Sequence, residues 1–405
     1  MRVDDLIVGG GPAGAAAAIR LAQAGHAPLL LERAEGPSDK VCGDFLAADA
    51  IERLQALGVA PAGLGAEDIH RVRLVHGRSV AEATLPFPAC GLSRRALDAA
   101  LLQRAAEAGA EVRFGAGVRD LTHGPAGWQL RTRWESFHAR SVFLATGKHD
   151  LRAHPRPGVR TGAVGLKMYF QLAPAQRATL SGAIELYLAP GVYAGLQNVE
   201  QGRSVLCLAV RGGCIRPWSD LLTALTAAMP QLRLRLGGAE PLLPRPLAVA
   251  GVPYGFLYRP AARLATLRNG AVANAAPTEA PAAAPAATIA GNATLYRLGD
   301  QAAVIPSLAG DGIAIALHSG SLAASCRLSG ADATTYHHLL AADLTSQMRI
   351  AGALHALALH PLLQRALPLC ARAAPGMLQR AAAATRIRAA AKFTERLPTR
   401  GLHPA

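Results

Sequence analysis

Short apolar runs alternate with helical patterns over the first third of the chain. Residues 3–8 predict a buried strand, a glycine turn follows at 9–14, and an alanine-rich helix extends to about Ala24. A second apolar run at 29–31 ends at Glu32. The order of strand, glycine turn, helix and strand within so short a stretch is typical of a parallel α/β unit.

The pattern changes further along the chain. A helix is expected near 47–57, strands near 69–76 and 79–84, a helix at 94–107, and a strand ending at 142–145. Residues 160–210 show alternating strands with few helix signals, which predicts an inserted antiparallel sheet. Residues 270–294 are almost all small residues and proline, so we expect a flexible loop there. A strand at 296–298 and a helix at 310–325 follow, and the remainder is helical.

Composition predicts a globular protein with more than one domain. The chain has 405 residues, of which 51% are hydrophobic and 17% charged, and its formal charge is +15. Aromatic residues make up only 4%, too few for a base-stacking platform, so no nucleic-acid partner is expected. Residues 345–405 carry 9 basic residues against Glu395. This region predicts either amphipathic helices that touch an anionic membrane or a carrier protein, or helices packed with a solvated basic face.

The sequence predicts no targeting segment and no cysteine-based metal or redox motif. The apolar run begins directly after Met1-Arg2, which leaves no room for a secretory signal, and no apolar stretch predicts a membrane span. The 6 cysteines form no C-x-x-C pair and no zinc-like spacing. We therefore expect a cytoplasmic protein with free thiols and no metal site.

The glycine turn has the spacing of a dinucleotide site. Gly9, Gly11 and Gly14 form G-x-G-x-x-G after a strand and before a helix. Such glycines permit a tight turn, the approach of a pyrophosphate and close helix packing. Glu32, at the end of the next strand, would accept the ribose hydroxyls and repel a 2′-phosphate. The spacing thus predicts the ADP half of FAD or NAD rather than of NADP.

A second motif lies far away, at 298–313. Its sequence, Leu-Gly-Asp-Gln-Ala-Ala-Val-Ile-Pro-Ser-Leu-Ala-Gly-Asp-Gly-Ile, resembles the late motif of FAD enzymes in the p-hydroxybenzoate hydroxylase and geranylgeranyl reductase superfamily. The resemblance implies that Asp300 binds the ribityl chain and that the backbone of 310–313 faces the flavin pyrimidine. A helix N-terminus there would favour the anionic reduced flavin.

Two further stretches extend the resemblance. Leu92-Ser93-Arg94-Arg95-Ala96-Leu97-Asp98 resembles the family's R-x-x-L-D helix, which implies that Arg94 contacts FAD, and residues 111–118 resemble the strand pair whose backbone at Val118 meets adenine. The cofactor-binding residues that we predict are Gly9, Gly11, Pro12, Ala13, Gly14, Glu32, Arg33, Cys42, Gly43, Arg94, Val118, Asp300, Pro306, Gly310, Asp311, Gly312 and Ile313.

Three segments depart from the family pattern. Residues 40–44, Lys-Val-Cys-Gly-Asp, resemble the reductases' K-x-C-G-G, with Asp44 in place of the second glycine. Residues 145–148, Ala-Thr-Gly-Lys, stand where the hydroxylases carry A-D-G, whose aspartate serves both FAD and the nicotinamide donor. We expect NAD(P)H as the reductant, although this motif does not support its use in the hydroxylase manner. Residues 189–197 match the reductases' substrate strand only by residue type. Cys42 and Tyr254 are the candidate catalytic residues, each with a plain buried side chain as the alternative.

The resemblance implies an α/β fold with a discontinuous Rossmann-like FAD-binding domain. We expect its first part at 1–160, an antiparallel substrate domain at 161–270, the loop at 271–294, a return segment at 295–325, and a basic helical region at 326–405. The expected activity is monooxygenation of a hydrophobic small molecule through a flavin C4a-hydroperoxide. A geranylgeranyl-reductase-like alkene reductase or dehydrogenase is one alternative, and a non-catalytic flavin-binding or electron-relay protein is another.

Overall fold

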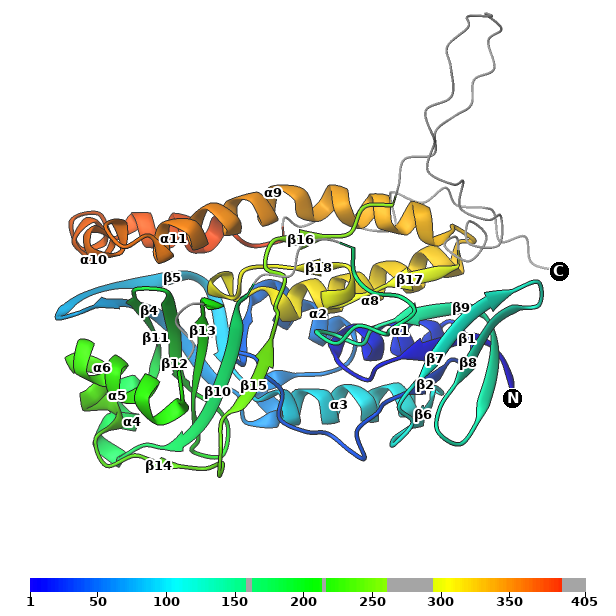
Figure 1. Ribbon diagram of the computed structural model, residues 1–405, viewed down its shortest axis with the longest axis horizontal. Coiled ribbons are helices and arrows are strands. Elements are labelled where there is room, and N and C mark those ends of the chain that lie inside the picture. The colour runs from blue at the N-terminus through cyan, green and yellow to red at the C-terminus, as the bar shows by residue number, and fades with distance from the viewer. Residues whose placement is uncertain (158–161, 213–215, 261–293, 388–405) are drawn as a thin grey trace, which may run out of the picture.

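Two sheets lie side by side along the long axis of the molecule, and helices cover both (Figure 1). The computed structural model describes residues 1–157, 162–212, 216–260 and 294–387. The first sheet has the order β6-β2-β1-β9-β8-β7, and β17 also pairs with β9. Its strands are β1 (Arg2–Val8), β2 (Leu29–Leu31), β6 (Glu111–Arg113), β7 (Asp120–Gly124), β8 (Gly127–Arg131), β9 (Ser136–Leu144) and β17 (Leu295–Arg297).

The centre of the first sheet is parallel and buried on both faces. Strand β1 pairs in parallel with β2 and β9, and β17 extends the parallel set from a distant part of the sequence. Ile7 packs toward helices α1 (Pro12–Gln23), α3 (Arg94–Glu107) and α8 (Gly312–Leu328), whereas its neighbours Leu6 and Val8 pack toward β7–β9. Such a strand needs an apolar run rather than alternation, as the sequence shows.

The second sheet has the order β14-β10-β13-β12-β11-β4-β5-β3, and β15 also pairs with β10. Only the β4–β11 pairing among those described in this sheet is parallel. The strands are β3 (Phe45–Ala47), β4 (Glu67–His76), β5 (Ser79–Gly91), β10 (Val164–Gln171), β11 (Gly182–Ala189), β12 (Val192–Asn198), β13 (Ser204–Val210), β14 (Glu240–Pro241) and β15 (Leu247–Ala250). Three of these strands come from residues before 92, inside the segment expected to begin the FAD-binding domain.

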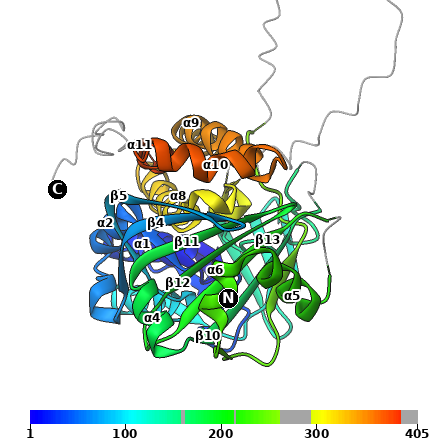
Figure 2. The ribbon, with the colours of Figure 1, turned by 90° about the vertical axis from the view of Figure 1, so that its left-hand side faces the viewer.

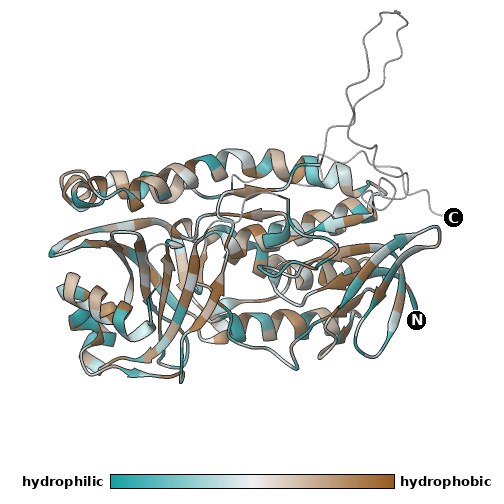
Figure 3. Cartoon of the chain, viewed as in Figure 1, coloured by the Kyte–Doolittle hydropathy of each residue, from teal (hydrophilic) through white to brown (hydrophobic). Residues whose placement is uncertain are grey.

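Helices cover both faces of the second sheet (Figures 1 and 2). Val75 packs toward the layer of α4 (Pro174–Leu180), α5 (Trp218–Ala228) and α6 (Pro230–Leu236), whereas Leu74 packs toward the C-terminal helices. The C-terminal helices are α9 (Ala333–Leu359), α10 (Leu363–Ala373) and α11 (Gly376–Ala384). The remaining described elements are α2 (Ala48–Ala56), the antiparallel pair of β16 (Phe256–Leu257) and β18 (Ala303–Val304), and short 3-10 turns at 61–64, 299–301 and 307–309. Brown, the colour of hydrophobic residues, covers much of the strands in both sheets, whereas the helices mix brown and teal along their length (Figure 3).

The architecture confirms the expected α/β fold, with an FAD-type Rossmann-like unit built from distant segments. The predicted helix at 94–107 is found with those bounds, and the late helix covers 312–328. The predicted loop at 271–294 lies outside the described residues except for Thr294, as do residues 388–405 of the basic region. In the described part of the chain, no helix is long and apolar enough to cross a membrane.

Candidate functional site

The glycine turn brings the start of α1 against two other segments. Gly11 caps the helix and Pro12 is its first residue. A Cβ at Gly14 would collide with the carbonyl oxygen of Gly9, and Gly9 itself has φ +109°, which favours glycine. A Cβ at Gly11 would lie 3.3 Å from Arg94 Nη2 and near no other heavy atom. Gly14 is therefore needed for packing, while Gly11 leaves room at the helix N-terminus for a pyrophosphate.

Glu32 is fixed beside this turn. Its Oε2 accepts a hydrogen bond of 2.7 Å from the Gly10 amide, and its Oε1 accepts one of 3.0 Å from the Ala34 amide. Two backbone donors thus hold the carboxylate at the end of β2, and its remaining lone pairs fit the ribose hydroxyls of an ADP group.

Arg94, the first residue of α3, lies beside the glycine turn at Gly11. Its Nε and Nη2 each donate to the Asp98 carboxylate at 2.8 Å. Burial opposes the charge, but the Asp98 carboxylate beside it raises the pKa of Arg94. The guanidinium is therefore a permanent, oriented cation next to Gly11, where phosphate oxygens would lie.

The late motif reaches the same place from the other end of the chain. Asp300 follows β17, and its Oδ2 lies 3.1 Å from Lys148 Nζ. This carboxylate is the main cause that raises the pKa of Lys148. The departure at 145–148 therefore places a cation against the aspartate expected to hold the ribityl chain.

The start of α8 is locked by the end of the described chain. The Asp311 side chain is fully buried, forms an ion pair with Arg386 and accepts a 3.2 Å hydrogen bond from Gln347 Nε2. Burial raises the pKa of Asp311 well above its usual range, against the effect of Arg386. The backbone of 310–313 begins the helix at this cavity as expected, but the Asp311 carboxylate faces the C-terminal region.

Asp44 explains the altered cysteine motif. Its φ is +57°, a left-handed conformation that suits the glycine of the family pattern and that aspartate also tolerates. The buried carboxylate accepts hydrogen bonds from Lys167 Nζ at 2.7 Å and from Tyr169 Oη at 2.6 Å. Burial raises the pKa of Asp44, while Lys167 opposes that shift. The ion pair holds the turn that carries Cys42.

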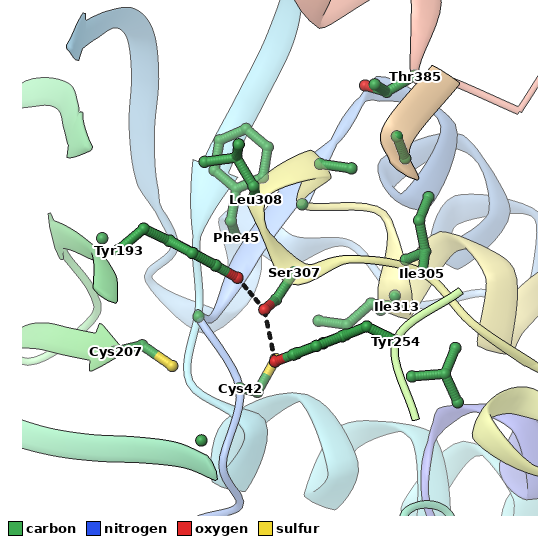
Figure 4. A pocket seen from close by; sticks show the side chains of 18 of the residues that line it. Cys42, Phe45, Tyr193, Cys207, Tyr254, Ile305, Ser307, Leu308, Ile313 and Thr385 are labelled. Atoms are coloured by element: carbon green, nitrogen blue, oxygen red, sulfur yellow. Dashed lines mark hydrogen bonds between the residues drawn. The ribbon is translucent and has the colours of Figure 1, made fainter. Parts of the chain in front are cut away.

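Three hydroxyl groups form a chain at the centre of the cavity (Figure 4). Tyr193 Oη is hydrogen bonded to Ser307 Oγ, and Ser307 Oγ donates to Tyr254 Oη at 2.8 Å. The ring of His355 lies 5.9 Å from that of Tyr193 and 5.6 Å from that of Tyr254. Burial raises the pKa of both tyrosines and lowers the pKa of His355, so all three are neutral near pH 7.

One cavity of about 570 Å³ joins these groups. Gly11, Arg94, Lys148 and Asp300 line it on the side of the first sheet. Toward the second sheet it is almost entirely apolar, and its lining there includes Val72, Leu74, Leu85, Phe87, Ile184, Leu186, Leu188, Leu354, Leu367 and Leu378. The cavity thus lies between the two sheets and under α9–α11, with the hydroxyl chain where its polar and apolar parts meet.

The cavity brings together many predicted residues and leaves others at its margin. Gly11, Pro12, Ala13, Cys42, Gly43, Arg94, Tyr254, Asp300, Gly310, Gly312 and Ile313 line it. Gly9, Gly14, Glu32 and Pro306 are structural neighbours of that lining, while Arg33 is exposed and Val118 half-buried beside β6.

Sequence reasoning missed four contributors: Tyr193, Ser307, Lys167 and Arg386. A lysine inside the apolar run of β10 was a readable signal for Lys167. The other three are revealed only by their tertiary contacts.

The residues present fit FAD. They supply a helix N-terminus with a small turn, a fixed carboxylate for ribose, an oriented arginine and a second helix N-terminus that lines the same cavity. Residues 2–141 match the family model described as FAD binding domain. This match establishes FAD as the cofactor.

The curated relatives are reductases. Over 133 residues the chain is 35% identical to a menaquinone reductase of Mycolicibacterium smegmatis, covering 31% of this chain and 32% of that protein. Over 270 residues it is 29% identical to digeranylgeranylglycerophospholipid reductase 2 of Methanopyrus kandleri, covering 62% of this chain and 66% of that protein. The chain thus spans about a third of the first relative's length and about two thirds of the second's.

Solved structures share the fold over most of the chain. A flavin-dependent brominase matches with a TM-score of 0.70 at 15% identity, covering 96% of this chain and 94% of that one. A geranylgeranyl bacteriochlorophyll reductase-like protein of Thermoplasma acidophilum matches with a TM-score of 0.66 at 18% identity, covering 88% of each chain. At such identities the likeness concerns the fold.

Proposed function

We propose, from the premise that this chain is an oxidoreductase of the FAD-dependent superfamily, that it reduces a carbon–carbon double bond in a long, apolar, isoprenoid-type substrate. The observation that carries the proposal is the single cavity that runs from the FAD-binding residues to an apolar chamber under α9–α11. A flexible hydrocarbon chain would fill such a chamber with few polar contacts. The names of the curated relatives support reduction rather than oxygenation.

FAD held by Gly11, Arg94 and Asp300 would, once reduced, supply hydride chemistry at one carbon of a double bond. The other carbon would then need a proton from this chain. Tyr254 can supply it. Because Ser307 donates its hydrogen to the Tyr254 oxygen, the Tyr254 hydroxyl hydrogen is free to point into the cavity. Its raised pKa keeps the proton in place near pH 7. Ser307 and Tyr193 can then relay to Tyr254 a proton that is taken from water. The hydride and this proton are the two hydrogen atoms that the product gains.

Cys42 is the second candidate acid. It lines the same cavity and its Sγ accepts a 3.5 Å hydrogen bond from the Asp44 amide. The Asp44–Lys167 pair therefore positions the thiol without touching the substrate chamber. NAD(P)H is the reductant that we propose for FAD.

A direct test uses the FAD-loaded protein, reduced with dithionite under anaerobic conditions and mixed with detergent-dispersed menaquinone or digeranylgeranylglycerophospholipid. We expect reoxidation of the flavin and a product with two more hydrogen atoms. Monooxygenation, our expectation from the sequence, instead requires O₂ and adds an oxygen atom. No reoxidation by either substrate without O₂, and no oxygenated product in its presence, would leave the electron-relay alternative.

Two variants separate the acids. Tyr254→Phe should slow product formation about 10²-fold, the usual contribution of a positioned acid, without changing FAD content. Tyr193→Phe keeps the Tyr254 proton and should cost much less. If Cys42→Ala has the large effect and Tyr254→Phe a small one, the thiol is the proton donor.

A further inference from the structure

Helix α10 turns leucines outward. Leu362, Leu363 and Leu369 are 70%, 40% and 56% exposed, whereas Gln364 is fully buried. A helix on a water-soluble surface normally shows the opposite pattern. Together with Leu357 of α9 and Met377 of α11, these side chains form what we name the outer leucine patch. All five side chains are more than a third exposed, and they belong to the helical layer that covers one face of the second sheet (Figures 1 and 2).

Arginines alternate with the patch residues along the sequence, and no acidic residue does. Arg365, Arg372 and Arg380 are exposed on α10 and α11. Residues 344–387 contain no Asp or Glu. Exposed leucines among arginines are the composition of helices that lie in the interface of an anionic bilayer.

The cavity reaches the surface within the same patch. Leu357 and Met377 both line the cavity, yet they are 41% and 37% exposed. Residues that face the chamber and the solvent at once mark its mouth. A chain-like apolar ligand would therefore enter and leave among leucines rather than across polar surface.

We propose that the outer leucine patch docks on an anionic lipid bilayer, and that a long-chain lipid passes between the bilayer and the cavity at Leu357 and Met377. The bilayer accounts for three features together: the exposed leucines, the arginines without acidic neighbours, and a mouth that opens inside the patch. A carrier protein would account for the charge but not for an apolar mouth. The identity of the lipid rests on the proposed function; the docking surface does not.

The test is flotation of the full-length, FAD-loaded protein with vesicles of phosphatidylcholine alone or mixed with phosphatidylglycerol. We expect binding to the mixed vesicles. Leu362→Ser with Leu369→Ser should weaken it about tenfold, because each leucine loses part of its transfer free energy. Leu234→Ser is the matched control: Leu234 is also 56% exposed, but on α6, across the second sheet (Figure 1).

Charge and chemistry are separated by two more measurements. Replacing Arg365, Arg372 and Arg380 by Gln should weaken binding about tenfold or more on mixed vesicles only. The leucine variant should reduce a detergent-dispersed substrate at the wild-type rate, so loss of docking and loss of chemistry are distinguishable. Absence of wild-type flotation, or equal loss in Leu234→Ser, overturns the proposal.

Discussion

The two ends of the cavity are built in different ways. At the FAD end, the elements behind the cavity lining pack backbone against backbone: a Cβ at Gly14 would collide with Gly9, and a Cβ at Gly320 would collide with the carbonyl oxygen of Ala13. At the substrate end, the wall consists of apolar side chains from β4, β11 and α9–α11. The buried Asp44–Lys167 ion pair lies outside this lining and holds the turn that carries Cys42.

The two ends therefore differ in the amino-acid substitutions that they can tolerate. Close backbone packing tolerates almost no added atom, whereas an apolar chamber tolerates exchanges of similar volume. The FAD end is therefore expected to be intolerant of single substitutions, and the substrate end to be sensitive mainly where a charge is buried. Five predictions probe this contrast.

The largest effect is expected at the glycine turn. Gly14→Val should lower the free energy of unfolding by about 3 kcal/mol or more, because the new side chain meets backbone that cannot move aside. Gly11→Val should leave the fold intact and yield colourless protein, since it blocks only the phosphate position. Urea titration and the absorbance ratio of flavin to protein measure the two effects. Equal FAD content in both variants and wild type would contradict the assignment of this end.

Lys167→Met should destabilise the protein by about 3–5 kcal/mol, because it leaves the Asp44 carboxylate buried without its counter-ion. Asp44→Gly places glycine at a left-handed position and removes that charge. The double variant should therefore recover most of the loss. Strict additivity of the two changes in thermal unfolding would refute the coupling.

Arg386→Gln tests the lock between the C-terminal region and the start of α8. It leaves the buried Asp311 carboxylate without its ion-pair partner, so stability should fall by about 3 kcal/mol. At a pH above the raised pKa of Asp311, the unpaired negative charge near the start of α8 should also lower the flavin midpoint potential. Asp311→Asn in the same background should reverse both changes. An unaltered potential in Arg386→Gln would place Asp311 outside the electrostatic reach of the flavin.

His337 predicts a pH dependence. Burial, with Arg297 nearby, lowers its pKa to about 3, and the neutral ring bridges the Ala333 carbonyl and the Arg297 amide. The unfolded chain binds a proton near pH 6.5 and the folded chain does not, so stability is lost as pH falls from 6.5 toward 3. The loss should reach about 2–3 kcal/mol by pH 4.5. His337→Gln should flatten this slope in urea titrations between these pH values; an unchanged slope excludes His337 as its source.

The smallest effect is expected for Lys148→Met. The Lys148–Asp300 pair is partly exposed, so stability should change by only about 0–1 kcal/mol. Flavin affinity, measured by the fluorescence of released FAD, should change more than stability does, because Asp300 then faces the ribityl chain uncompensated. A large stability loss with unchanged affinity would make the pair structural.

Most of the FAD end was predictable from local patterns. Gly9, Gly11, Gly14 and Glu32 lie within one short unit, and their spacing alone specifies a turn and a partner strand. For Asp311, the sequence predicted the position of the backbone but not that of the side chain. The side chain forms an ion pair with Arg386, which is far away in sequence. The monooxygenase expectation stays untested, and the reductase relatives support its alternative.

The substrate end was much less predictable. Tyr254 was a candidate from the sequence, but its partners Ser307 and Tyr193 come from other segments and carry no motif of their own. The expected basic surface was likewise recognised by its charge, whereas the outward leucines of α10 depend on which face of the helix meets β5.

The sequence by itself determined the cofactor, because phosphate and ribose recognition depends on backbone shape and a few residues at fixed short spacing. Only the packing of the whole fold shows the chamber, and with it the proposed mouth and the proposed proton donors. These depend on apolar contacts, which are non-directional and interchangeable, and on polar pairs between segments far apart in sequence. Their partners become known only when the two sheets and the C-terminal helices are brought together.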